Sequence, residues 1–353
     1  MNAVPPVDGR DISELLAPQG ARRQDIPGFD ADYADIVDYI IRCTHRIWEQ
    51  KDVGLITTHY ADDILIHTMT GPIRGRDTVI ANTSRTLAAF PDRTLVGEAV
   101  IWSEDAPGTF LSSHRITSSA TNLGPSEFGP ATGRRVGFTT IADCLCRENL
   151  IVEEWLVRDN SALAFGLGLS PRRIARGQAE ADRQSGSAAD WRREAIDQVR
   201  AVPATAFHHE PLPPASEPET YAAEVFDRIL NHRRFGQVRD LYSPAAHWQG
   251  PGGRRLFGHA EIAGWYIALV ATFGDIRVRV DHVAAVDVPG GTDLAVRWSM
   301  AGRHDGSALY GRPSSRDVYI LGVTHWRIHE GLIASEVTVF DEISLLRQIE
   351  GGL

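Results

Sequence analysis

Features that mark several large classes of protein are scarce in this chain. Only three cysteines occur among 353 residues, and an odd count does not build a disulfide framework. We expect Cys43, Cys144 and Cys146 to be small buried side chains. No apolar run reaches the about 18 residues that a membrane-spanning helix needs, so no membrane partner is expected. The 36 basic side chains are outnumbered by 46 acidic ones and form no cluster, which argues against a nucleic-acid partner.

Two further absences bear on location and chemistry. The first 28 residues contain no apolar core of a secretion signal, so we expect a cytoplasmic protein. The 13 histidines are spread along the chain, and we predict no catalytic metal. The charged fraction of 23% and the hydrophobic fraction of 43% are typical of an ordinary globular protein.

The chain contains two copies of one segment. Residues 150–163, LIVEEWLVRDNSAL, match residues 332–345, LIASEVTVFDEISL, at a separation of 182 positions. Further matches at 182 or 183 positions extend over most of both halves, such as Tyr60 with Tyr242 and Phe90 with Phe273. A nearly constant separation over such a length indicates duplication of a complete domain rather than a short solenoid repeat.

Each half begins with helices and continues as a series of strands, the order typical of an α+β domain. Helical spacing of apolar residues predicts helices over 32–49 and 78–89 in the first half, and over 221–231 and 262–273 in the second. Alternation predicts strands in the first half over 94–102, 109–117, 135–146 and 151–159. The resulting division is an N-terminal arm (1–28), a first domain (29–170), a helical segment with a proline-rich linker (171–218) and a second domain (219–353).

Both copies carry a turn with glycines, a polar run before a strand, and an aspartate near the domain end. In the first copy these are Gly124, the run FGPATGR over 128–134, and Trp155 with Asp159. In the second they are GRHDG over 302–306, Tyr310-Gly311, and Asp341. Their order and spacing resemble the SnoaL-like polyketide cyclases, within the superfamily named for nuclear transport factor two.

The resemblance implies two tandem cone-shaped domains of the cystatin-like α+β barrel type. In each, a curved antiparallel sheet wraps around helices and leaves an apolar pocket. It also implies a cofactor-independent acid/base enzyme of the cyclase, isomerase, lyase or hydrolase type, acting on a small apolar carbonyl-bearing molecule in the first pocket. Because the fold alone does not determine function, a non-catalytic ligand-binding or scaffold protein is the alternative.

The second copy departs from the family pattern. Ser314-Ser315 stands where the first copy has Thr132-Gly133, and Val337 replaces Trp155. These departures argue against catalysis by the second copy, whose pocket is then vestigial or only binds a ligand.

Asp159 is the leading candidate for a catalytic base. By strand alternation it shares one face with Ile151, Trp155 and Val157, which would place its carboxylate at the edge of an apolar interior. The alternative is an acid that caps the turn formed by the next residues. On the same alternation, Glu154 and its counterpart Glu336 face the other side as ordinary solvated or interface carboxylates.

Proton abstraction next to a carbonyl also needs a donor to the developing oxyanion. The other catalytic candidates are therefore His67, His114 and Arg115, and because His114 and Arg115 are adjacent, only one of them faces inward. Candidate ligand-binding side chains, some of which we expect in the core instead, are Trp48, Tyr60, Trp102, Phe138 and Trp155 in the first copy, and Tyr242, Gln249, Trp265, Arg297, Trp298 and Asp341 in the second.

We expect the two copies to pack against each other through their sheets as an intramolecular pseudo-dimer, with a homodimer as a further arrangement. Charged side chains of the outer strand faces, such as Glu154 and Arg158, would then lie near that contact.

Overall fold

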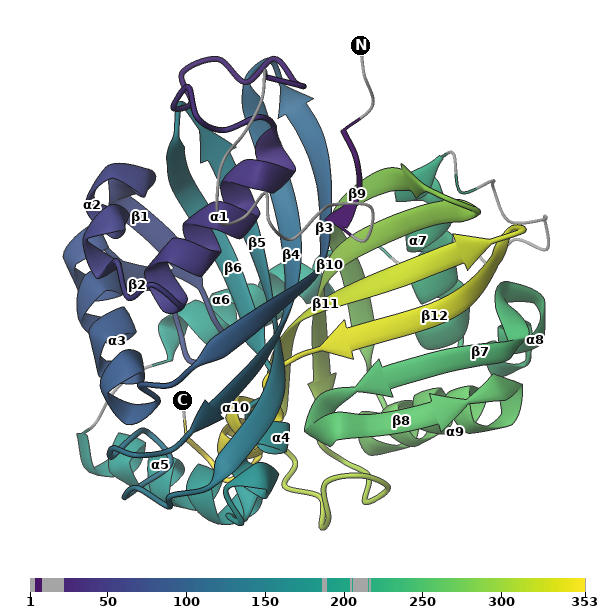
Figure 1. Ribbon diagram of the computed structural model, residues 1–353. Helices are drawn as coiled ribbons and strands as arrows, with labels where there is room; N and C mark the ends of the chain where they lie inside the picture. The colour runs from purple at the N-terminus through teal and green to yellow at the C-terminus, as the bar shows by residue number, and fades with distance from the viewer. Residues whose placement is uncertain are drawn as a thin grey trace. The chain divides into compact units, whose positions relative to one another are not determined.

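The chain folds into two compact units, which Figure 1 shows in the computed structural model. The described residues are 4–7, 22–185, 189–203, 205, 215 and 217–352. The first unit comprises the described residues up to Thr68, Pro72–Arg158 and Gly166–Gly168, and the second comprises Met69–Gly71, Asp159–Phe165 and the described residues from Leu169 onward. Most of the predicted N-terminal arm and of the proline-rich linker lies outside the described residues.

The first unit places helices and a six-stranded sheet in the order predicted from the sequence. Its elements are α1 (Ile36–Trp48), α2 (Ile56–His59), β1 (Tyr60–His67), β2 (Ile73–Arg74), α3 (Arg76–Ala89), β3 (Thr94–Ala106), β4 (Thr109–Thr121), β5 (Arg135–Arg147) and β6 (Leu150–Arg158). The three strands that follow α3 are each 13 residues long.

The second unit repeats this series and adds helices before and after it. Its elements are α4 (Asn160–Gly166, except its last residue), α5 (Pro171–Ser185), α6 (Asp190–Arg200), α7 (Pro218–Phe226), α8 (Val238–Leu241), β7 (Tyr242–Gly250), β8 (Arg254–Phe257), α9 (Gly258–Thr272), β9 (Arg277–Val288), β10 (Gly291–Arg303), β11 (Asp317–His329), β12 (Leu332–Val339) and α10 (Glu342–Ile349).

The two sheets have the same strand order. It is β2-β1-β6-β5-β4-β3 in the first unit and β8-β7-β12-β11-β10-β9 in the second. Pairing partners also correspond at the sequence separation of the repeat, since Ile116 faces Thr140 and Trp298 faces Gly322. The predicted duplication and the tandem α+β fold are therefore confirmed.

The sheets are mixed rather than wholly antiparallel. β1 runs parallel to β6, and β7 runs parallel to β12, while the other neighbours are antiparallel. A parallel pair needs a long crossover between its strands, and here α3 and the β3–β5 meander supply it. The alternation of residues that predicts a strand does not report the direction of its neighbour.

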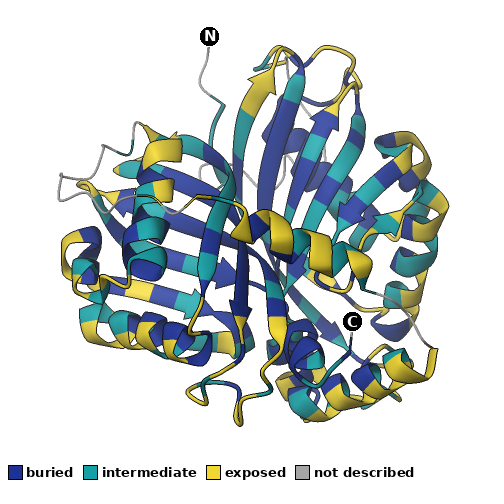
Figure 2. Cartoon of the chain, turned by 180° about the vertical axis from the view of Figure 1, so that it is seen from behind, coloured by how far each residue is buried: buried dark blue, intermediate teal, exposed yellow. Residues whose placement is uncertain are grey.

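The core of the first unit lies between α1 and the sheet. Asp35 begins α1 as its N-cap, accepting a hydrogen bond of 2.8 Å from the Asp38 amide, and the helix then buries Ile36, Val37 and Ile40. These side chains form one cluster with strand residues, and Figure 2 shows the strands largely in the colour of buried residues. The sheet face that meets α1 is called the interior face below.

β6 does not alternate evenly along its length. Against β5, Leu145 faces Glu153 while Cys146 faces Ile151, so Val152 is an extra residue in the ladder. Such a bulge exchanges the faces of all residues beyond it. Ile151 and Glu154 therefore share the interior face. The strand β12 has the same irregularity, which brings Glu336 to the interior face of the second unit.

The predicted helical segment within 171–218 contains α5 and α6, but these helices do not form a separate unit. α5 packs along α10, where Arg172 pairs with Glu350 at 2.7 Å. α6 buries Ile196 and Val199 against Ala301 of β10. Both helices therefore belong to the second unit. Among the described residues, no helix is long and apolar enough to cross a membrane.

Close packing inside the second unit predicts a strong effect of one glycine. A Cβ atom on Gly322 would lie 2.2 Å from the Trp298 ring, so we expect Gly322→Ala to lower the free energy of unfolding by about 3 kcal/mol. Gly177→Ala is the matched control, because Gly177 lies in α5 with nothing within 4 Å of its added Cβ, and it should stabilise by up to about 1 kcal/mol. Urea denaturation of both variants measures the difference, and equal effects would contradict this packing.

Candidate functional site

The interior face of β6 carries Glu154, Leu156 and Arg158 in the first unit. Because of the bulge at Val152, Glu154 faces α1 and not the opposite side of the sheet. The prediction that Glu154 and Arg158 lie on an outer face is therefore wrong. Across the sheet, Glu154 pairs with Cys144 of β5 and with Ile66 of β1. The name interior site is used here for Tyr60, Ala142, Glu154, Leu156 and Arg158.

Glu154 is a buried carboxyl group without a hydrogen-bond donor. It is 6% exposed, and no described residue donates a hydrogen bond to it. Burial raises its pKa from 4.5 to about 7, Arg158 opposes that rise, and Asp143 adds to it. A carboxyl group with a pKa near neutrality can accept and return a proton at physiological pH.

Tyr60 and His114 are two further ionisable side chains on the interior face. Burial and the charge of Glu154 raise the pKa of Tyr60 well above its usual value, so its hydroxyl keeps its proton and acts as a donor. Burial lowers the pKa of His114 to about 3, so its ring is neutral. Nδ1 of His114 lies 3.4 Å from the Thr44 hydroxyl, and its ring rests against Gly97.

Three residues of the interior site are more exposed than the matching residues of the second unit. Tyr60, Ala142 and Leu156 are each only half-buried although they belong to central parts of the fold. Their counterparts Tyr242, Thr324 and Thr338 are 0%, 1% and 6% exposed, respectively. The residues around Glu154 are therefore less completely buried than the residues around Glu336.

Glu336, the counterpart of Glu154, is saturated with hydrogen bonds. Its Oε1 accepts from Trp248 Nε1 at 2.7 Å and from the Thr338 hydroxyl at 2.6 Å. Its Oε2 accepts from Tyr242 at 2.5 Å and from Trp326 Nε1 at 2.9 Å, and the Tyr266 hydroxyl lies 3.1 Å from both oxygens. Five donors surround one carboxylate, which leaves no lone pair for a substrate.

Aromatic rings fill the rest of the second interior. Trp298 packs against Phe226 at 5.7 Å between centroids and against Phe340 at 6.2 Å, and its Nε1 donates to Thr324 at 3.0 Å. Trp265 packs on Trp248 at 5.0 Å. These candidate ligand-binding residues of the second copy are core residues.

Asp159 caps a helix and does not point into the interior site. Its Oδ1 accepts from the Ala162 amide and the Ser161 hydroxyl at 3.0 Å each, and from the Gly252 amide at 2.8 Å. Its Oδ2 accepts from the Gly253 amide at 3.0 Å. A carboxylate that accepts four such bonds is held in place, so the alternative reading as a cap applies and the expected base role does not.

Asp341 has the same function in the second copy. It is the N-cap of α10 and accepts from the amides of Ile343 and Ser344 at 3.0 and 3.2 Å. Burial raises its pKa, and the hydrogen bonds from Ser344 and Asn160 oppose that rise. Both aspartates of the repeated segment are thus structural.

Three predicted residues of the first copy lie on the face opposite the interior. His67 Nε2 lies 2.7 Å from Glu153 Oε1, and the His67 ring stacks on Trp155 with centroids 5.0 Å apart. Arg115 pairs with Glu98 at 2.9 Å. None of these three contacts Glu154, so the structure does not join them to the interior site.

The remaining candidates divide between the two faces. Trp48, Trp102 and Phe138 lie on the interior side of the first unit, where Trp102 packs against Phe110 at 6.1 Å and Trp48 lies beneath a guanidinium at 4.1 Å. Arg297 and Gln249 each lie on the strand face opposite to a buried tryptophan neighbour, Trp298 and Trp248 respectively.

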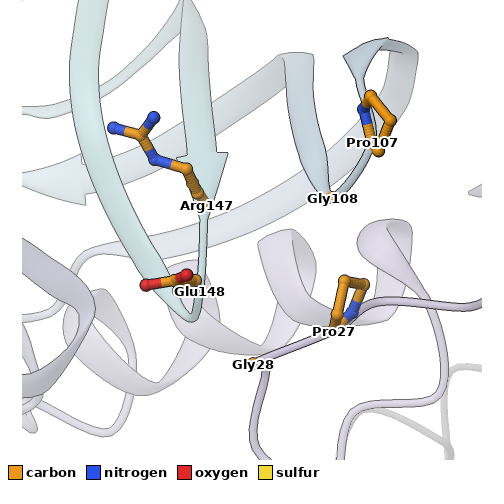
Figure 3. Close-up of a pocket in the computed structure, with 6 residues that line it drawn as sticks. All are labelled: Pro27, Gly28, Pro107, Gly108, Arg147 and Glu148. Carbon is orange, nitrogen blue, oxygen red and sulfur yellow. The ribbon is translucent and has the colours of Figure 1, made fainter.

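A shallow hollow of about 430 Å³ lies at the hairpin turns of the first unit (Figure 3), and none of the interior-site residues is among those that line it. Pro107 and Gly108 of the β3–β4 turn, Arg147 and Glu148 of the β5–β6 turn, and Pro27 with Gly28 line it. Arg147 and Glu148 are its charged lining residues, and both are exposed. The hollow therefore contains no buried charged group.

Metal-ligating side chains do not gather in the part of the chain that the structure describes, where no group of three or more could hold an ion. His325 and His329 have the spacing of a helical metal-binding pair, but they lie on strand β11. Residues four apart on a strand are about 13 Å apart, which is too far for one ion.

A family model for SnoaL-like polyketide cyclases matches residues 39–165 and again residues 220–349, together well over half of the chain. This chain belongs to the SnoaL-like polyketide cyclase family. The two matched segments begin within α1 and α7, respectively, and both run past the bulged strand that carries the interior glutamate. The family assignment thus applies to both copies.

Solved structures similar to this SnoaL-like protein include three from Streptomyces. TsrD from Streptomyces laurentii is 20% identical and covers 38% of this chain and 96% of its own, with a TM-score of 0.34. AclR from Streptomyces galilaeus is 23% identical, with 38% and 97% covered and a TM-score of 0.34. IdmH from Streptomyces antibioticus is 24% identical, with 38% and 98% covered and a TM-score of 0.33. No match is found among curated proteins.

The same substitution in the two copies of this SnoaL-like chain should have opposite effects on stability. The pKa of Glu154 is higher in the folded state than in the unfolded state. As the pH rises from 4.5 through about 7, the unfolded chain therefore releases this proton first, and the free energy of unfolding falls by about 3 kcal/mol. Glu154→Gln removes that loss, so its free energy of unfolding relative to the native protein should rise by about 3 kcal/mol across this range.

Glu336→Gln is the counterpart in the second copy. The amide presents an NH₂ group to a site lined by donors, which should destabilise the fold by about 3 to 5 kcal/mol. Urea denaturation at both ends of the pH range measures both variants. Equal destabilisation by the two substitutions would contradict the difference between the two interiors.

Capping by Asp159 predicts an effect on stability that does not depend on any substrate. Asp159→Asn turns an amide group toward the Gly252 and Gly253 amides, so we expect a loss of about 2 kcal/mol in the free energy of unfolding. Asp62→Asn is the control, because the Asp62 side chain is 83% exposed. A variant at Asp159 as stable as the control would show that these bonds contribute little.

Proposed function

We propose that the first unit is a cofactor-independent acid/base catalyst that moves a proton next to a carbonyl group of a small, apolar molecule. The observation that carries this proposal is Glu154, a buried carboxyl with a pKa of about 7 and no hydrogen-bond donor among the described residues. Membership of the cyclase family supports the reaction class. The substrate decides whether this proton transfer leads to ring closure or to migration of a double bond.

Glu154 acts as the base in its ionised form. It takes the proton from the carbon beside the carbonyl, and the electron pair of that C–H bond moves into an enolate whose charge lies on oxygen. The raised pKa makes the carboxylate a stronger base than an exposed glutamate while leaving about half of it ionised near neutrality. The protonated Glu154 then returns its proton to the product.

Tyr60 supplies the hydrogen bond to the enolate oxygen. Its hydroxyl keeps its proton, and it senses the charge of Glu154 without donating a hydrogen bond to it. In the second copy the matching Tyr242 donates to Glu336 at 2.5 Å and is therefore occupied. The open hydroxyl of Tyr60 is available for a substrate, which is the role of an oxyanion donor.

The second unit has no comparable site in this proposal. Its glutamate is saturated, and aromatic rings occupy the space beside it. We therefore assign turnover to the first copy alone, with the second copy as a structural partner.

Exchange of a ketone's α-protons with solvent tests this proposal without knowledge of the natural substrate. β-Tetralone in deuterated buffer, followed by NMR, should exchange faster with the protein, and the rate should rise with pH and level off above about 7. Glu154→Gln should lower the catalysed rate by about 100-fold or more, and Tyr60→Phe by a similar factor.

Glu153→Gln is the matched control for this experiment. Glu153 is the preceding residue and lies on the opposite face of β6, where it contacts His67. Its substitution should leave the exchange rate unchanged. Undiminished exchange in Glu154→Gln would reject the assignment of the base, and the interior site would then be a binding site only.

A further inference from the structure

Arg93 places a buried guanidinium at the end of the interior face. It follows α3 and is 4% exposed, and its Nε and Nη2 donate to the Ser118 hydroxyl at 3.2 and 2.9 Å. The guanidinium lies 4.1 Å from the Trp48 ring and 5.4 Å from the Phe138 ring. Its Nη1 is buried and has no hydrogen-bond partner, and no carboxylate pairs with it, within the described parts of the chain.

Arg158 brings a second guanidinium to the same ring. It lies 5.9 Å from Phe138, and its buried Nε has no partner in the described ranges. Its ion pair with Glu127 is 3.9 Å long, at the limit of such contacts, and the Glu127 side chain is 54% exposed. Burial and the charge of Arg158 lower the pKa of Arg93 to about 9, as expected for two cations that repel each other.

The fold itself does not require these two cations. In the second unit the position of Arg93 is occupied by Ile276 and that of Arg158 by Phe340, and both are buried apolar residues. A buried cation without a carboxylate costs free energy, and the same architecture exists here without that cost. The arginines of the first unit therefore serve something other than the assembly of the sheet.

The arginines and Glu154 lie at opposite ends of the interior site. Arg158 is four residues beyond Glu154 on β6, a separation of about 13 Å between Cα atoms. The half-buried Leu156 and Ala142 pair between them and form an apolar floor. Thr140, which pairs with Arg158, adds a buried hydroxyl that has no hydrogen-bond partner within the described ranges.

We propose that the interior site of the first unit takes an anionic ligand, namely an apolar ring compound whose carboxylate lies between Arg93 and Arg158 while its carbonyl group reaches Glu154. This specifies the substrate class of the site proposed above and rests on that function for the role of the carbonyl. The apolar body lies on Leu156 and Ala142. Nη1 of Arg93 and Nε of Arg158 are the donors for the carboxylate, which matches the planar geometry of guanidinium recognition.

Binding of one acid and its ester to the full chain tests the proposal. The probes are an acetylnaphthoate, with its ketone and carboxylate at opposite ends of the ring system, and its methyl ester, which lacks the charge. Isothermal titration calorimetry should show the acid bound at least about tenfold more tightly than the ester, with an affinity that falls as salt is added. Arg93→Met and Arg158→Met should each weaken the acid by about 10- to 100-fold and leave the ester unchanged.

Two control variants separate this result from damage to the fold. Arg115→Met removes a guanidinium from the opposite face of β4 and should change neither affinity. Arg93→Lys keeps the charge and should retain part of the preference for the acid. Melting temperatures of all variants show whether each one is folded. If Arg93→Met is unfolded, Arg158→Met tests the proposal in its place.

Failure of this proposal is distinguishable from failure of the proposed reaction. Glu154→Gln should abolish proton exchange but still bind the acid, because it leaves both arginines intact. Equal affinity for acid and ester, no measurable binding of either, or arginine variants that bind like the native protein would overturn the anionic ligand class. Arginine-dependent binding of the acid without any exchange would instead reject the catalytic role and leave the ligand class standing.

Discussion

The burial of one carboxylate is the constraint on which both units depend. A bulge at the same place in β6 and β12 turns a glutamate into the interior of each unit, where water no longer solvates its charge. The second unit meets the cost with five hydrogen-bond donors around Glu336. No described residue donates a hydrogen bond to Glu154, and burial raises its pKa instead. One sequence feature thus yields a carboxylate held by five hydrogen-bond donors in one copy and a buried carboxyl of raised pKa in the other.

The surroundings of the two glutamates diverge in a complementary way. Where the second copy has Trp248, Trp326 and Thr338 as donors, the first has Ile66, Cys144 and Leu156. At the other end of the interior the relation reverses, because polar residues of the first copy correspond in sequence to apolar residues of the second. These pairs are Arg93 with Ile276, Arg158 with Phe340, Ser118 with Met300, and Thr140 with Gly322. The first copy therefore has fewer donors around its carboxylate and more polar groups at the other end of its interior.

The sequence carried enough information for the fold but not for the orientation of β6. Constant separations such as that of Tyr60 and Tyr242 reveal the duplication, and the predicted helices and strands agree with α1, α3 and the long strands that follow. The face assignment failed because an extra residue at Val152 reverses the alternation, and nothing in the letters LIVEEW separates a bulged strand from a regular one. Without that extra residue, regular alternation would place Trp155 and Asp159 on the interior face in place of Glu154.

The signal that could have identified Glu154 was present in the repeat. Glu154 and Glu336 are identical between copies that differ at most other positions of the same strand. Asp159 and Asp341 are identical too, and the structure shows why, since both cap the helix that follows. Identity within a duplication therefore marks both structural and chemical roles, and only the hydrogen-bond partners distinguish them. Arg93 gave no comparable signal, because the second copy has Ile276 at this position and the residue is not shared.

Buried polar groups of the first unit lie along the interior face without a hydrogen-bond partner among the described residues, and the proposed ligand would use them. Within the described residues, a buried guanidinium with an unpaired donor, a hydroxyl without a partner and a carboxyl of raised pKa each cost free energy in the folded protein. A ligand that pairs with these groups gains affinity, because binding removes the cost of leaving them unpaired. The groups around Glu336 already pair with one another, so a ligand would gain nothing from them. The closed second unit, with Trp298 packed on the backbone of Gly322, has the opposite property and keeps a core that needs no ligand. Duplication thus allows two copies of one fold to surround the same buried glutamate in different ways.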